Sequence, residues 1–135
     1  MTAKLRLYKT VTMAKILIIE DDHEFRAMVR KMLERGGYND IEEAPNGSIG
    51  VKLFRQQSFD LIITDIIMPE KEGIEMIMEL TKNYPRIKII AMSGGGKIDP
   101  QKYLDLANFL GASRTLAKPF EQPDIIKMVR ELLGE

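Results

Sequence analysis

The sequence predicts an α/β fold in which one doubly wound sheet of five parallel strands is covered by five helices. Short apolar runs alternate along the chain with segments whose apolar residues recur at helical spacing. Three of the runs stop directly at a charged residue, as strands of a sheet buried on both faces do. Right-handed crossovers between parallel strands place helices on both faces, so a two-faced sandwich is the economical arrangement.

The five strands are recognised as short apolar runs, of which the second is the weakest. They are expected at 15–19, 41–44, 60–64, 87–92 and 114–117. The helices between them are marked by glycine and proline. The first carries Phe25 to Leu33 and ends at Gly36-Gly37, and the second spans about 48–57. The third spans about 73–83 before Pro85, the fourth runs from Pro100 to near Gly111, and the last starts near Pro123-Asp124.

Residues 1–12 differ from the rest of the chain, and 13–135 are expected to form the single domain. The first twelve residues are interpreted as a mostly disordered N-terminal extension, which would arise if translation starts upstream of Met13. The alternative is an additional edge strand, because basic and apolar residues alternate there with a period of two.

Composition excludes several classes of protein. The chain has 20 basic and 20 acidic residues, so no basic excess points to nucleic acid. It has no cysteine, which excludes disulfides and thiolate metal sites, and its single histidine, His23, argues against zinc. No apolar stretch approaches the roughly 20 residues of a membrane span, and no signal peptide is visible, so a cytoplasmic protein without membrane or nucleic-acid partners is expected.

Acidic residues gather where two strands end. Glu20, Asp21 and Asp22 follow the first strand directly, and Asp65 follows the third. If these strands are neighbours, Glu20, Asp21 and Asp65 crowd together at one edge of the sheet and raise one another's pKa. A Mg²⁺ ion, which prefers oxygen ligands, would relieve that repulsion. Asp22 is interpreted instead as the N-cap of the first helix.

Lys118 and Ser93 close two further strands at the same edge. Lys118 precedes Pro119 directly after the fifth strand, and Ser93 follows the fourth. An ammonium group there can reach an anionic group held at Asp65. The alternatives are an ordinary surface lysine and an ordinary loop serine. Read together, the residues combine a carboxylate, a cation site, a hydroxyl and an ammonium.

This combination resembles the receiver domain of two-component response regulators, of the single-domain chemotaxis type, over residues 14 to 134. The matching pieces occur in order at domain-consistent spacing. They are Ile16 to Asp22, Phe59 to Pro69, Gly73, Ile89 to Gly94, Gly111 to Ser113 and Ala117 to Phe120. The resemblance implies a flavodoxin-like sheet with strand order 2-1-3-4-5.

The resemblance also implies a role for each site residue. Asp65 matches the phosphoacceptor, Ser93 the hydroxyl that binds the phosphoryl group, and Lys118 the lysine that pairs with it. Asp21, Asp65 and the backbone carbonyl of Ile67 match the Mg²⁺ ligands, with Glu20 in support. Thr115 stands where the family usually has an aromatic switch residue, and a threonine has no ring to move.

The function implied is a phosphorylated signalling switch rather than an enzyme. Its phosphoryl donor would be a sensor histidine kinase or a histidine phosphotransfer protein. Its output would be contact with a partner protein through the face formed by the helix at 100–111, the strand at 114–117 and the last helix. Homodimer formation stays open.

Two other functions fit the sequence less well. A phosphatase of the haloacid dehalogenase type also phosphorylates an aspartate after a buried strand, but it needs a second aspartate where this chain has Ile67. A flavodoxin-like electron carrier needs a hydroxyl-rich loop after the first strand, and Glu20-Asp21-Asp22 would repel the flavin phosphate.

Overall fold

A five-stranded parallel sheet forms the centre of the computed structural model, which describes residues 13–66, 72–94, 102, 105 and 111–135. The spatial order of the strands is β2-β1-β3-β4-β5. The strands are β1 (Lys15–Ile19), β2 (Asp40–Ala44), β3 (Leu61–Asp65), β4 (Ile89–Ser93) and β5 (Arg114–Ala117). Every neighbouring pair is parallel, which confirms the predicted doubly wound sheet and its 2-1-3-4-5 order.

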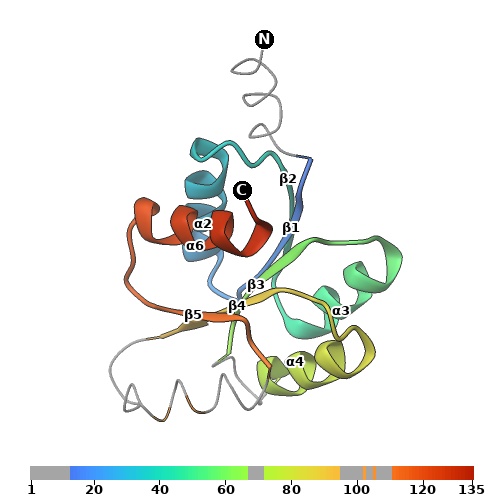
Figure 1. Ribbon diagram of the computed structural model, residues 1–135. Helices are drawn as coiled ribbons and strands as arrows, with labels where there is room; N and C mark the ends of the chain where they lie inside the picture. Colours follow the sequence, from blue (N-terminus) through green and yellow to red (C-terminus); the bar gives the residue numbers. More distant parts are fainter. Residues whose placement is uncertain (1–12, 67–71, 95–101, 103–104, 106–110) are drawn as a thin grey trace.

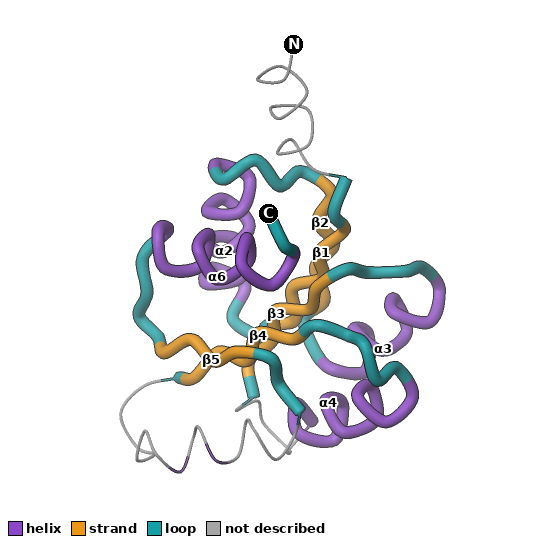
Figure 2. The backbone as a smooth tube through the Cα atoms, in the orientation of Figure 1, coloured by secondary structure: helices purple, strands orange, loops and turns teal. Residues whose placement is uncertain are grey.

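Helices cover both faces of the sheet. Within the described residues they are α2 (His23–Arg35), α3 (Gly47–Gln56), α4 (Glu72–Asn83) and α6 (Gln122–Leu133). Helices α2 and α6 lie on one face, and α3 and α4 lie on the other (Figure 1 and Figure 2). The fourth predicted helix falls between Pro100 and Gly111, mostly outside the described residues; Lys102 and Asp105 are described there and are helical.

The core consists of two apolar layers, one on each face of the sheet. Successive side chains of a strand point to opposite faces. Leu17 and Ile19 therefore pack into the layer beneath α3 and α4, whereas Ile16 and Ile18 pack into the layer beneath α2 and α6. All four side chains are fully buried. Burial on both faces explains why β1 reads as a continuous apolar run rather than an alternating one.

Local signals set the ends of α2 and α6 near the predicted positions. The Asp22 side chain accepts a hydrogen bond of 3.1 Å from the Phe25 backbone N–H, which confirms Asp22 as the N-cap of α2. The helix ends at Arg35, and Gly37 then takes a φ of 99°, a conformation that glycine adopts without strain. Helix α6 begins at Gln122, where the Asp124 carboxylate accepts from the Glu121 backbone N–H at 3.0 Å.

The predicted bounds of β3 and β4 are wrong by one or two residues. Ile87 belongs to a turn, because its N–H donates to the Tyr84 carbonyl at 3.0 Å, so β4 starts at Ile89 and extends to Ser93. Strand β3 likewise ends at Asp65 rather than one residue before it, since Asp65 still pairs with Met92. Tertiary pairing thus carries both strands one residue further toward the edge where the charged residues gather. The predicted bounds of the other three strands agree within one residue.

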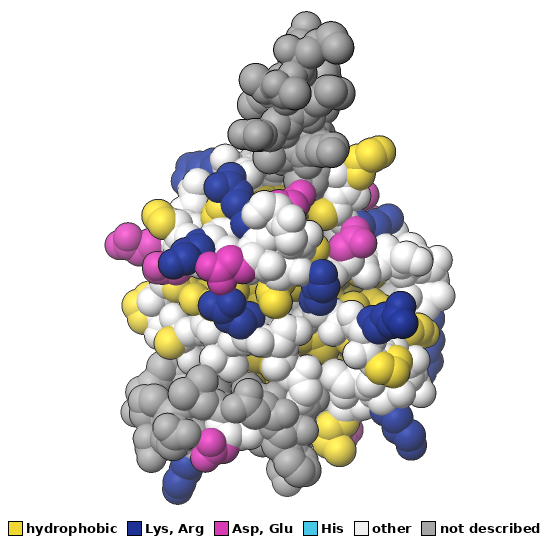
Figure 3. All heavy atoms as spheres, in the orientation of Figure 1, with side chains coloured by type: hydrophobic (Ala, Val, Ile, Leu, Met, Phe, Trp, Pro, Cys, Tyr) yellow, Lys and Arg dark blue, Asp and Glu magenta, His cyan; other side chains and the backbone are white. Residues whose placement is uncertain are grey.

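The surface gives no sign of a single-signed patch on the face seen in Figure 3, where basic and acidic side chains are interspersed. Among the described residues, no helix is both long enough and apolar enough to span a bilayer. Residues 1–12, interpreted from the sequence as an extension or an edge strand, lie outside the described residues.

Candidate functional site

Three carboxylates meet just beyond the carboxyl ends of β1 and β3. The two strands are direct neighbours, with Ile19 paired to Thr64, so Glu20 and Asp65 leave the sheet side by side. Carboxylate oxygens of Glu20, Asp21 and Asp65 lie within 4.8 Å of one another. The predicted convergence of these acids is confirmed in the described part of the chain.

Lys118 binds two of these acids at once. It follows β5, and its Nζ lies 2.5 Å from Glu20 Oε1 and 2.9 Å from Asp65 Oδ2. The Glu20 side chain is 1% exposed, and Lys118 is 16% exposed. One ammonium group therefore bridges two carboxylates in a largely dry setting, where an unpaired charge would be costly.

Burial shifts the protonation of this group of residues. Loss of solvation raises the pKa of Glu20 from 4.5 to about 7, and the neighbouring Asp65 charge adds to the rise while Lys118 opposes it. Burial would lower the pKa of Lys118, but its hydrogen bonds to Glu20 and Asp65 outweigh that effect and raise it. Lys118 thus keeps its proton, and the acids remain under mutual repulsion in spite of it. A further cation would relieve the excess negative charge.

The consecutive acids after β1 differ in environment. Glu20 is buried, whereas Asp21 and Asp22 are exposed. Asp22 is occupied in capping α2, which leaves Asp21 as the acid of this loop that faces both solvent and the cluster. The sequence assigned Glu20 a supporting role; the structure shows that it is also the partner of Lys118.

Of the remaining predicted residues, the structure describes Ser93 and Thr115 but not Ile67. Ser93 ends β4 next to Met92, the partner of Asp65, and its carbonyl accepts from the Lys118 N–H at 2.8 Å. Ile67 lies outside the described residues, so its predicted carbonyl ligand stays a prediction. Thr115 is partly buried in β5 opposite Ala91.

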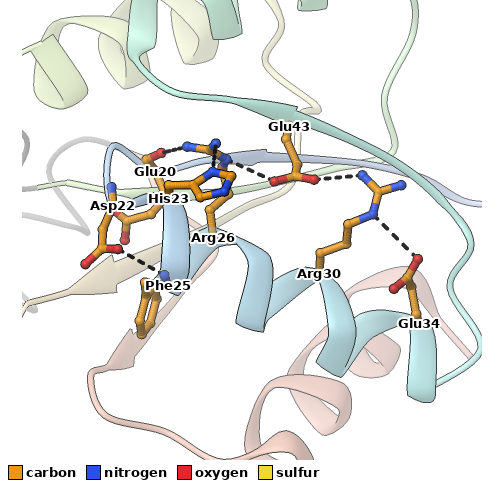
Figure 4. Close-up of polar contacts among 8 residues, drawn as sticks. All are labelled: Glu20, Asp22, His23, Phe25, Arg26, Arg30, Glu34 and Glu43. Atoms are coloured by element: carbon orange, nitrogen blue, oxygen red, sulfur yellow. Dashed lines mark hydrogen bonds and ion pairs between the residues drawn. The ribbon is translucent and has the colours of Figure 1, made fainter.

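Two residues of α2 contribute to the site and were not recognised from the sequence as doing so. The Phe25 ring lies under the Lys118 ammonium, 4.2 Å from Nζ to the ring centroid. The Arg26 guanidinium holds the Glu20 carbonyl at 2.8 Å (Figure 4). The helical spacing of Phe25 in the sequence indicates that the ring packs into the core, but it cannot predict the contact with Lys118 after β5.

Comparison with known proteins agrees with this geometry. A model of the response regulator receiver domain matches residues 16–130. The chain belongs to the response regulator receiver family. It is 31% identical to the response regulator receiver protein CpdR of Brucella abortus over 90% of this chain and 98% of that protein. It is 30% identical to the chemotaxis protein CheY of Bacillus subtilis, over 89% of this chain and 98% of CheY.

A solved structure carries the same fold. The response regulator TrrA of Thermotoga maritima, crystallised with Mg²⁺-BeF, is 30% identical and superimposes with a TM-score of 0.77 over 90% of this chain and all of TrrA. Receiver domains are signalling domains of two-component systems. Because the chain belongs to this family, it is neither a phosphatase of the haloacid dehalogenase type nor a flavodoxin.

Proposed function

We propose that this receiver domain accepts a phosphoryl group on Asp65 from a phosphohistidine of a sensor kinase or phosphotransfer protein, and signals by a change in partner binding. The observation that best supports the proposal is the placement of Asp65. It is buried at the end of β3, hydrogen-bonded to Lys118 at 2.9 Å, and joined by two further acids within 4.8 Å.

The residues present suit an in-line displacement at phosphorus. A carboxylate oxygen of Asp65 forms the new bond to phosphorus while the bond from phosphorus to the donor imidazole nitrogen breaks, and the electron pair leaves with that nitrogen. A carboxylate nucleophile carries no proton that must be removed, so no general base is needed. Lys118, kept protonated by its raised pKa, donates to the phosphoryl oxygens as charge develops on them.

The cluster of acids fits a hard divalent cation. Oxygen ligands lie close together there, and burial of Glu20 leaves negative charge poorly solvated. Asp21, Asp65 and the Ile67 carbonyl would hold a Mg²⁺ ion, with Glu20 in support. When bound, the ion would offset the negative charge of the acids and of the phosphoryl group.

The remaining parts of the proposal follow from the resemblance stated above. Ser93, at the end of β4, donates its hydroxyl to the phosphoryl group. The acyl phosphate on Asp65 hydrolyses slowly, without turnover of a separate substrate. Output passes through the face that includes β5 and α6, by binding another protein or a second copy of the chain.

The test is phosphorylation by acetyl phosphate in the presence of Mg²⁺, followed by intact-mass measurement. Wild type should gain one phosphoryl group, and Asp65→Asn should gain none. Asp60→Asn is the matched control, because Asp60 lies just before the first residue of the same strand, far from the site, and accepts there from the Lys15 N–H at 2.8 Å. Equal labelling of Asp65→Asn and wild type would refute the assignment.

A further inference from the structure

Arg26 makes contacts to two other segments of the chain and to the first turn of its own helix. Its Nε lies 3.0 Å from Glu43 Oε1 on β2, and one terminal nitrogen donates to the Glu20 carbonyl at 2.8 Å. The other terminal nitrogen lies 2.9 Å from His23 Nδ1. Figure 4 shows the guanidinium inserted between the turn after β1 and the end of β2. The side chain is 12% exposed, which is low for arginine.

The carbonyl that Arg26 binds belongs to the peptide between Glu20 and Asp21. The other groups of Glu20 are also held, because its N–H donates to the Ala44 carbonyl at 3.1 Å and its Oε2 accepts from the Asp22 N–H at 3.3 Å. Rotation of the Glu20–Asp21 peptide would redirect the Asp21 side chain. The hydrogen bond from Arg26 opposes that rotation, so it bears directly on where the exposed carboxylate of Asp21 lies.

Glu43 anchors the guanidinium from the side of β2. It accepts from Arg26 through one oxygen and from Arg30 through the other, at 3.0 and 2.9 Å. A guanidinium is planar and presents its donors in a rigid fork, so binding at Nε fixes the direction of the terminal nitrogens. The position of Glu43 on the strand is thus transmitted to the Glu20 carbonyl.

We propose that Arg26 is a positioning residue for the cation and phosphoryl site, spanning Glu43 and the Glu20 carbonyl so that Asp21 is held in the geometry for Mg²⁺. This inference rests on the proposed function. Groups that hold metal ligands in place commonly change metal affinity by roughly tenfold or more when removed.

Arg30 is a matched control on the same helix. It pairs with the same carboxylate of Glu43, and its other described partner is Glu34 at 3.5 Å. Figure 4 shows its guanidinium directed away from the turn after β1. Removing Arg30 therefore removes a similar ion pair and the same charge, but no hydrogen bond to the Glu20 carbonyl.

The sign of the effect separates positioning from simple electrostatics. Arg26 carries a positive charge near the acids, so loss of the charge by itself would make Mg²⁺ bind more tightly. Loss of positioning has the opposite effect, because Asp21 would spend less time in the binding geometry. A weaker Mg²⁺ affinity in Arg26→Gln cannot result from removal of the charge.

The experiment measures Mg²⁺ affinity by calorimetric titration of the unphosphorylated chain. We expect Arg26→Gln to weaken binding about tenfold and Arg30→Gln to stay within about twofold of wild type. With acetyl phosphate, the Mg²⁺ concentration for half-maximal phosphorylation should rise in parallel, while the rate at saturating Mg²⁺ stays within about twofold. Equal affinities in the two variants, or tighter binding in Arg26→Gln, would overturn the proposal.

If Arg26→Gln does not fold, two variants that keep the positive charge, Arg26→Lys and Arg30→Lys, provide the test. The single nitrogen of Arg26→Lys cannot span Glu43 and the Glu20 carbonyl as the fork does, so Mg²⁺ should bind about threefold more weakly than to Arg30→Lys. Equal affinity in these two variants would also overturn the proposal. If wild type itself neither binds Mg²⁺ nor becomes phosphorylated, the proposed function fails instead.

Discussion

Lys118 and Arg55 each form a close ion pair with a glutamate, yet the two pairs lie in contrasting surroundings. Lys118 Nζ lies 2.5 Å from Glu20 and Arg55 lies 2.6 Å from Glu79, so the contact distances are nearly equal. Glu20 is buried at the end of the sheet, whereas Arg55 is 61% exposed on α3 and Glu79 lies on the exposed surface of α4. The two pairs therefore differ in their exposure to solvent and not in their contact distance.

Solvent decides what each pair does for the chain. Exposed pairs contribute between zero and about 1 kcal/mol, because water screens the charges and two long side chains lose freedom. At the buried site, removal of one partner leaves a charge that neither water nor protein compensates. The same contact is therefore dispensable on the helix surface and indispensable at the edge of the sheet, where its charges are also available for chemistry.

The largest expected effect comes from removing the cation of the buried site. Lys118→Met retains much of the apolar stem but leaves Glu20 and Asp65 facing each other, so the free energy of unfolding without Mg²⁺ should fall by about 3 kcal/mol. Urea denaturation followed by circular dichroism measures the loss. Arg114→Met is the control, since Arg114 pairs with Glu131 at 2.7 Å on the exposed surface. Similar losses in both variants would contradict the contrast drawn above.

The buried pair should also make the free energy of unfolding depend on pH, whereas the exposed pair should not. The pKa of Glu20 is about 7 in the folded chain against an ordinary value of 4.5, so between these values the folded chain binds more protons than the unfolded one. The contribution of Glu20 to stability is therefore present below about 4.5 and is lost as the pH rises through 7.

Glu20→Gln removes this titration. In Mg²⁺-free buffer, the free energy of unfolding of wild type minus that of Glu20→Gln should fall by about 2 kcal/mol across the window. The corresponding difference for Glu79→Gln, on the exposed pair, should stay flat. Parallel pH curves for wild type and Glu20→Gln would show that burial does not raise the pKa of Glu20.

Phe25 tests whether the aromatic ring beneath Lys118 contributes to the buried site. Its ring lies 4.2 Å from the ammonium and packs edge-on against Phe120 at 5.6 Å. Phe25→Leu should lower the free energy of unfolding by about 1 kcal/mol. A double-mutant cycle with Lys118→Met isolates the part that depends on the charge. Strict additivity in that cycle would mean that the ring only fills space.

The smallest effect is expected at the exposed pair. A double-mutant cycle on Arg55 and Glu79 should give a coupling free energy of about 0.3 kcal/mol, decreasing as salt is added. Thermal or urea unfolding at low and high ionic strength provides the measurement. A coupling as large as the loss in Lys118→Met would remove burial as the explanation for the difference.

The class of fold and the edge of the sheet at which charges gather can be predicted from the sequence alone. Continuous apolar runs such as Ile16 to Ile19 indicate strands buried on both faces. The acids and the lysine follow such runs directly in the sequence, so they must lie at the carboxyl ends of the parallel strands. Asp22 as an N-cap was likewise readable, because capping depends on residues only a few positions apart.

Which of these side chains contact one another depends on how the elements pack in the folded chain. Glu20 and Asp21 are adjacent in the chain, yet one is buried against Lys118 and the other faces solvent. Arg26 reaches Glu43, and Phe25 lies under Lys118, across elements that no local pattern relates. Periodicity records which face of an element is apolar, whereas contacts between elements depend on strand register and helix position. Burial and pKa shifts, which follow from those contacts, therefore become visible only in the folded chain.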